Sequence, residues 1–237
     1  MSDLTRDLMQ AIRRASARCA SAPIIAEIKA RTPRSGELLR GRSVEALVGE
    51  YEAAGAIAIS VVTGAWFGGT LSMLERAAGA TQLPLLRKDL IPNRASLLQS
   101  RQRGASAVLI TTRLHSPTAL QDHIGYALEL GLTPFVEVDD LDQLATLRLP
   151  EQTVVAINNS DIRSQERHTR GITRSLELLP HARATGAGAL VAASAICTPQ
   201  DAQQLRAAGF DALLIGSALL QARSAGAALR ELQTVTS

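Results

Sequence analysis

Two lysines stand out in a chain that otherwise uses arginine for its positive charge. Of the 25 basic residues, only Lys29 and Lys88 are lysines. A lysine ammonium is a compact charge that can give up its proton near neutral pH, whereas an arginine guanidinium keeps its proton in proteins. Each lysine closes a short apolar run, as at a buried strand that ends in a charge. Both are therefore candidate proton donors, although two lysines left by chance at exposed positions would give the same pattern.

Carboxylate and amide side chains close other apolar runs. Glu27 stands two residues before Lys29, so both would project from one side of a strand and could keep each other ionised. Glu137 and Asn158 end two further runs. Taken singly, each such residue is more often an ordinary hydrogen-bonding group than a catalyst. Their convergence with two lysines predicts an acid–base site.

Eight apolar runs, separated by segments with helical spacing, predict the elements that hold these residues. Eight strand–helix units indicate a single α/β domain, a (β/α)₈ TIM barrel, whose carboxyl strand ends share one mouth. A doubly wound sheet is the alternative, but its glycine-rich dinucleotide motif is missing after the first run. The predicted strands are Pro23–Lys29, Ile57–Thr63, Leu83–Lys88, Ala107–Thr111, Pro134–Val138, Val154–Asn158, Ala189–Ser194 and Ala212–Gly216.

An amphipathic segment precedes the first predicted strand, with Leu4, Leu8 and Ile12 on one face. We therefore divide the chain into a short N-terminal helical extension, residues 1–22, and a catalytic barrel, residues 23–237. Several helical segments end in glycine, as helices commonly do. The sequence shows no low-complexity linker that would separate a second domain.

The last two predicted loops indicate a phosphate site. Ser194 and Ala195 follow the seventh strand, and Gly216 and Ser217 follow the eighth, just before a short helical stretch at Ala218–Arg223. Backbone N–H groups at such a helix start, beside a serine hydroxyl, bind phosphate in many barrels. The alternative is an ordinary helix with Ser217 as its N-cap.

Composition excludes several classes of function. A net charge of +3 and 3% aromatic residues argue against a nucleic-acid-binding protein. The sequence has no apolar run of roughly 18 residues that could span a membrane, and its first 22 residues do not resemble a secretory signal. Cys19 and Cys197 form neither a disulfide framework nor a metal cluster. We expect a cytoplasmic enzyme that acts on a small anion.

An ordered set of short motifs resembles the indole-3-glycerol-phosphate synthase family, a family of barrel enzymes of tryptophan biosynthesis. The resemblance runs from about Pro23 to Leu220. It rests on Ala26-Glu27-Ile28-Lys29 followed by Thr32-Pro33, Phe67-Gly68-Gly69-Thr70, Leu86-Arg87-Lys88-Asp89, Val136-Glu137-Val138, Ile157-Asn158-Asn159 and Ile215-Gly216-Ser217.

The resemblance implies roles for these residues. Lys88 would be the general acid that protonates the substrate ketone, and Glu137 the general base of the dehydration. Lys29 would bind an anionic group and help to expel the hydroxyl, Glu27 would orient both lysines, and Asn158 would hold polar groups of the substrate. Thr32, Arg34, Phe67, Ser194, Ala195, Gly216 and Ser217 would line the substrate and phosphate site.

The implied reaction closes 1-(2-carboxyphenylamino)-1-deoxyribulose 5-phosphate to indole-3-glycerol phosphate, with loss of carbon dioxide and water. It needs no cofactor or metal. The implied partner is the sugar phosphate alone, and the protein would be a monomer or a weak homo-oligomer.

The chain departs from the family pattern inside the predicted pocket. Ala193 replaces a glutamate, Ala195 a glycine, Ser160 an arginine and Leu90 an aromatic residue. We hypothesise that Arg34 partly replaces the missing arginine, although an exposed loop arginine is the simpler explanation. The N-terminal extension is shorter than is usual in the family, which predicts a less complete lid.

Three other functions are compatible with the same residues. A related enzyme could act on an arylamino sugar phosphate with a modified aryl group, as Leu90 and Ser160 would permit. A Schiff-base aldolase could use Lys29 or Lys88 as its nucleophile. A barrel that binds a phosphorylated ligand without turning it over is the third. Phosphoribosylanthranilate isomerase is set aside, because a cysteine is expected where Lys29 stands.

Overall fold

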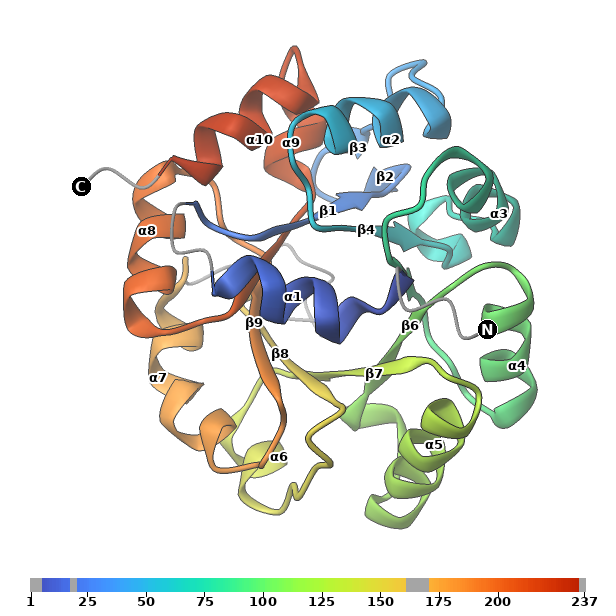
Figure 1. Cartoon of the computed structure of the whole chain (residues 1–237), viewed down its shortest axis with the longest axis vertical. Helices are drawn as coiled ribbons and strands as arrows, with labels where there is room; N and C mark the ends of the chain where they lie inside the picture. The colour runs from blue at the N-terminus through green and yellow to red at the C-terminus, as the bar shows by residue number, and fades with distance from the viewer. Residues whose placement is uncertain (1–5, 18–20, 161–170, 235–237) are drawn as a thin grey trace.

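Eight parallel strands close into a barrel, as the sequence predicted (Figure 1). The computed structural model describes residues 6–17, 21–160 and 171–234. The order around the barrel is β1-β10-β9-β8-β7-β6-β5-β4, and the ends differ from the predicted ones by at most two residues. The strands are β1 (Ile24–Ile28), β4 (Ala58–Val62), β5 (Leu85–Lys88), β6 (Ala107–Thr111), β7 (Thr133–Val138), β8 (Val154–Asn158), β9 (Ala189–Ala193) and β10 (Ala212–Ile215).

Helices surround the barrel, and most of the segments that follow the strands carry a clear helix start signal. Seven of them begin at a Ser, Thr, Asn or Asp whose side chain accepts a backbone N–H of the first turn. Four are followed by a glycine in the left-handed conformation. The outer helices are α2 (Val44–Ala53), α3 (Leu71–Ala80), α4 (Arg94–Gln102), α5 (Pro117–Glu129), α6 (Leu141–Ala145), α7 (Thr173–Arg183), α8 (Pro199–Ala208), α9 (Ser217–Gln221) and α10 (Ala225–Gln233).

Shorter elements sit in the loops. The loop after β1 contains a two-stranded antiparallel hairpin of β2 (Arg31–Thr32) and β3 (Gly36–Glu37), which the sequence did not predict. Two 3₁₀ turns, η2 (Ala65–Phe67) and η3 (Thr112–Leu114), follow β4 and β6. The hairpin and η2 each carry a predicted binding residue, Thr32 and Phe67.

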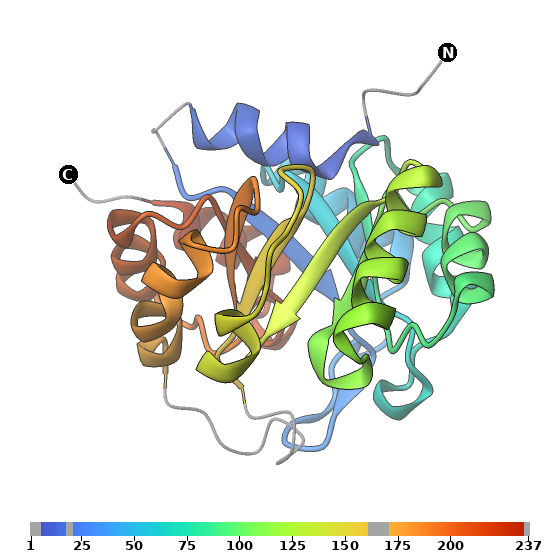
Figure 2. The ribbon, with the colours of Figure 1, turned by 90° about the horizontal axis from the view of Figure 1, so that it is seen from below.

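The first helix, α1 (Leu8–Ser16), closes the amino end of the barrel. Leu8, Met9 and Ile12 are buried against residues that begin the strands, such as Ile25 and Ala58. Figures 1 and 2 show α1 lying across this end, with the strands running away from it. The sequence predicted a less complete lid; α1 lies at the end of the barrel opposite the mouth and gives the mouth no cover.

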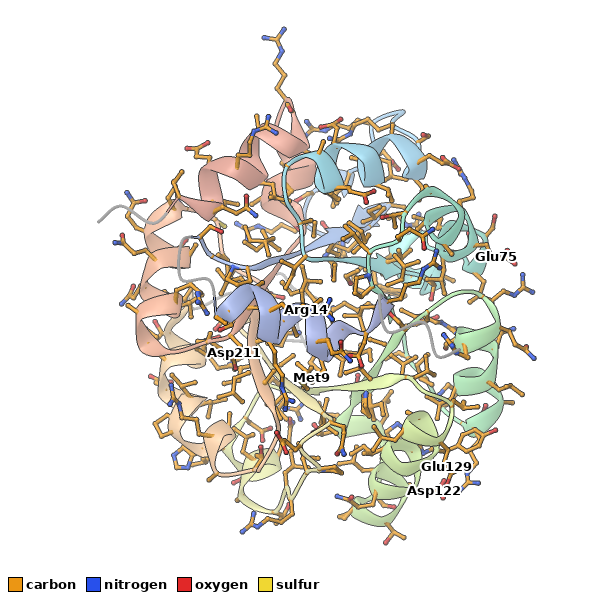
Figure 3. All side chains as sticks on the ribbon, in the orientation of Figure 1. Met9, Arg14, Glu75, Asp122, Glu129 and Asp211 are labelled. Atoms are coloured by element: carbon orange, nitrogen blue, oxygen red, sulfur yellow. The ribbon has the colours of Figure 1, made fainter. Side chains whose placement is uncertain are left out.

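The sequence predicted the buried face of α1 from Leu4, Leu8 and Ile12. Leu8 and Ile12 confirm it, and Leu4 lies outside the described residues. The opposite face is charged: Arg14 is exposed, whereas Met9 is buried, and Figure 3 labels both. Among the helices of the described ranges, none combines the length and the apolar character that a membrane crossing requires.

His115 should make stability sensitive to acid. Its ring lies 4.3 Å from the ring of His123. Burial lowers the pKa of His115 below its usual 6.5 and His123 lowers it further, while a hydrogen bond with the Ile91 backbone opposes them. The neutral form thus stabilises the fold above pH 6.5, and that stability is lost as the pH falls below this value.

The prediction can be checked by urea unfolding at a series of pH values. Wild type should lose more stability than His115→Gln between pH 6.5 and about pH 5, since glutamine keeps a hydrogen-bond donor but does not titrate. Parallel pH profiles for the two proteins would contradict this role of His115.

Candidate active site

The barrel brings the predicted acid–base residues together at the carboxyl ends of its strands. Glu27, on β1, lies between the two lysines: its Oε1 is 3.1 Å from Lys29 Nζ, and its Oε2 is 3.8 Å from Lys88 Nζ. Lys88 Nζ is also 3.7 Å from Oε2 of Glu137, across the mouth on β7. The four side chains therefore alternate in charge, with Lys88 held between two carboxylates.

Glu27 is ionised in this cluster although it is only 3% exposed. Burial by itself raises the pKa of Glu27, but the attraction of Lys29 and Lys88, and hydrogen bonding to them, bring it below the usual carboxyl value. At neutral pH the carboxylate therefore keeps its charge. It fixes both ammonium groups at the mouth, as the same-side spacing of Glu27 and Lys29 predicted.

A network that sequence reasoning did not assign holds the end of β5. Asp89 Oδ2 accepts hydrogen bonds from Thr63 Oγ1 at 2.8 Å and from Arg87 Nη2 at 3.0 Å. Arg87 Nη1 also donates a hydrogen bond to Ser100 Oγ on α4 at 3.0 Å. Lys88 stands between Arg87 and Asp89 in sequence, so this network fixes the backbone that carries it. In the sequence, the only sign of this network was that polar residues stand on both sides of Lys88.

The larger of the two pockets beside this cluster has a volume of about 610 Å³ and a mixed lining, and we call it the polar pocket because it holds more polar groups than the second one. Lys29 and Glu27 form its inner end. The loops after β1, β8, β9 and β10 supply the rest of its wall, and Arg34 and Ser160 face the same space. Its lining includes the predicted residues Thr32, Arg34, Ser194, Ala195, Gly216 and Ser217.

Position 216 must be a glycine because the Glu27 carboxylate lies directly beside it. A Cβ at this position would lie 2.6 Å from Glu27 Oε1, so any larger residue would displace Glu27. Gly216 is the N-cap of α9, and Ser217 is already the first helical residue; the cap makes no side-chain hydrogen bond. The alternative that Ser217 is the N-cap is therefore wrong, because the helix starts at Ser217 itself and not at Ala218.

A second pocket of about 430 Å³ lies on the other side of Lys29 and is mostly apolar. Phe67 and Leu109 lie along it, together with Trp66, and the Phe67 ring centroid is 5.5 Å from Lys29 Nζ. Lys88, Glu137 and Asn158 line its inner end, where the acid–base cluster begins. Lys29 lines both pockets, so one elongated molecule could fill both and pass the cluster at its middle.

Of the four residues that depart from the family pattern, three, namely Leu90, Ser160 and Ala195, lie where they would meet such a molecule. Leu90 is 61% exposed at the edge of the apolar pocket, and Ser160 lines the polar one. Ala193, at the end of β9, is buried. Asn158 accepts a hydrogen bond on Oδ1 from the Ser160 backbone N–H at 2.9 Å, which fixes the amide at the apolar pocket.

A sequence model of the indole-3-glycerol phosphate synthase family matches residues 1–232. The chain belongs to this family. Indole-3-glycerol phosphate synthase of Pyrococcus furiosus is 37% identical over 226 residues, which cover 94% of this chain and 95% of that protein. The enzyme of Thermococcus kodakarensis is 35% identical over 230 residues, covering 96% and 97%. The resemblance stated from the motifs is confirmed.

Solved structures support the fold independently of the sequence. A tryptophan synthase α-subunit of P. furiosus superposes with a TM-score of 0.67 at 14% identity, covering 90% of this chain and 98% of that one. A tryptophan synthase chain of M. tuberculosis gives 0.68 at 15% identity, covering 95% and 96%. At such low identity these matches show the barrel fold alone. In the described ranges, no group of three His, Cys, Asp or Glu side chains could hold a metal ion.

Proposed function

We infer that the chain is an indole-3-glycerol phosphate synthase, which closes 1-(2-carboxyphenylamino)-1-deoxyribulose 5-phosphate to indole-3-glycerol phosphate with release of carbon dioxide and water. The observation that carries this is the position of Lys88, held between Glu27 and Glu137 where a polar and an apolar pocket meet. Family membership supplies the reaction, and the two pockets match the two ends of its substrate.

The two pockets suggest how the substrate lies. We assign the phosphate to the polar pocket, near the Ser194–Ala195 and Gly216–Ser217 turns, and the aryl ring to the apolar pocket beside Phe67. Lys29 then faces the aryl carboxylate from between the pockets. Arg34 shares the polar pocket with Ser160, which supports the hypothesis that it partly replaces the arginine of the family.

The cluster can carry each proton that the reaction moves. Lys88 donates a proton to the ketone oxygen as the ring carbon bearing the carboxylate forms the new carbon–carbon bond, and that carboxylate leaves as carbon dioxide. Glu137 then removes a proton and returns it to the hydroxyl, which departs as water, while Lys29 stabilises the leaving oxygen. Glu27 holds both lysines in place, and Asn158 orients the polar groups of the sugar.

We further propose a cytoplasmic enzyme whose partner is the sugar phosphate alone, working as a monomer or weak homo-oligomer. The low net charge of +3 supports a small dissolved substrate rather than a polyanionic partner.

The purified protein should turn over this substrate, with indole fluorescence as the readout. Lys88→Ala is the matched blank, because it removes the proposed acid. Turnover that disappears in the blank supports the proposed function. Substrate that binds without turnover in wild type would instead indicate a modified aryl substrate or a non-catalytic binding protein.

A further inference from the structure

Asn159 lies behind the wall of the polar pocket, fully buried and outside the set of residues that line it. We propose that Asn159 is a positioning residue. It holds the part of this wall formed by Ser194 and Ala195 in the conformation that receives the sugar phosphate. The inference rests on the proposed function, since it assigns the phosphate to this pocket. Sequence reasoning placed Asn159 in a family motif but gave it no role.

The wall that Asn159 supports has an unfavourable backbone conformation. Ser194 and Ala195 both adopt left-handed φ angles, of 67° and 58°. L-residues with a Cβ rarely occupy this region, and two in succession persist only where the surrounding structure holds them. Three described non-glycine residues have a positive φ, and these two are the pair that faces the pocket.

The Asn159 side-chain amide donates hydrogen bonds to both carbonyl groups at the start of this turn. Its Nδ2 donates to Ala193 O at 3.2 Å and to Ser194 O at 3.1 Å, and its backbone N–H also donates to Ala193 O at 2.9 Å. A side-chain amide offers two N–H donors, whereas an aspartate of the same shape offers none. The residue type therefore matches the two carbonyls that it meets.

The other end of the amide is anchored to a helix. Asn159 Oδ1 accepts the Ser175 backbone N–H at 2.9 Å, in the first turn of α7. Ile172, at the N-cap position of α7, makes no capping hydrogen bond with its side chain, so Asn159 supplies a cap from outside the helix. One buried side chain thus joins β8, the left-handed turn after β9 and the start of α7.

Asn159→Asp tests the proposal, alone and combined with Ala195→Gly. Aspartate keeps an oxygen for the Ser175 N–H but cannot donate to the two carbonyls. We expect KM for the sugar phosphate to rise about tenfold while kcat stays within about twofold. The inhibition constant of inorganic phosphate, used as a competing probe, should rise in parallel. Asn93→Asp, at an exposed helix cap, is the matched control and should leave KM unchanged.

Glycine at position 195 should rescue the variant, because glycine adopts the left-handed conformation without strain. In the Ala195→Gly background, Asn159→Asp should therefore raise KM by much less than in wild type. An unchanged KM in folded Asn159→Asp would overturn the proposal, and so would an equal rise in KM in both backgrounds. A merely structural role would not give this rescue.

Stability gives a second test that does not depend on turnover. If Asn159→Asp does not fold, Asn159→Ala takes its place, and unfolding midpoints are compared with and without Ala195→Gly. The glycine should stabilise the Asn159→Ala protein more than it stabilises wild type. Equal gains would overturn the proposal. Absence of turnover in wild type would contradict the proposed function. The comparison of unfolding midpoints would still test the role of Asn159.

Discussion

Lys88→Arg is expected to lower kcat by about 10²- to 10⁴-fold, the contribution of a positioned general acid. The reason is chemical, since arginine keeps the positive charge between Glu27 and Glu137 but does not release its proton. The protein should therefore remain folded, with little change in its thermal unfolding midpoint. Steady-state kinetics by indole fluorescence, together with thermal unfolding, measure both quantities.

The only other lysine supplies the matched control. Lys29→Arg keeps a cation at the boundary of the two pockets, where we assign it to anion binding, so it should raise KM more than it lowers kcat. If Lys88→Arg kept kcat within about tenfold of wild type, the general acid would have to be another group, and the assignment of Lys88 would be wrong.

Glu27→Gln is expected to destabilise the protein by about 3–5 kcal/mol, the usual effect of removing one partner of a buried ion pair. Glutamine keeps the shape of the side chain but leaves the Lys29 and Lys88 ammonium groups facing each other without the charge between them. Turnover should fall as well, because both lysines lose their alignment. Urea unfolding at neutral pH and steady-state kinetics measure the two effects.

Acid should remove the difference between wild type and Glu27→Gln. Because the pKa of Glu27 is lowered in the folded protein, its charge stabilises the fold above its usual value of 4.5, and this contribution is lost as the pH falls through the lower folded-state pKa. The exposed Arg76–Glu45 pair gives the control: Glu45→Gln should leave the unfolding midpoint unchanged. A Glu27→Gln protein as stable as wild type at neutral pH would contradict the central role of Glu27.

The sequence predicted the features that depend on local pattern. Each barrel strand is a short apolar run, and a parallel barrel places the ends of all runs at one mouth, so the spacing of the runs was enough to bring Glu27, Lys88 and Glu137 together. The helix ends predicted by the terminal glycines are local in the same sense.

Features that depend on distant backbone were not predicted. The role of Asn159 follows from the path of the chain after β9, 34 residues further along, and no spacing rule indicates it. The need for glycine at position 216 follows from its contact with Glu27, nearly the whole chain away. An amphipathic helix such as α1 can cover either end of a barrel, and its pattern alone does not say which.

With α1 at one end and a packed interior, the barrel is not a channel through which molecules pass. Leu8, Met9 and Ile12 fill the amino end of the barrel, opposite the catalytic cluster. Both pockets are lined by strand ends and loops at the carboxyl end, so the product leaves by the end at which the sugar phosphate entered. Arrival and departure are sequential events at one opening, so slow release of product delays the following turnover directly.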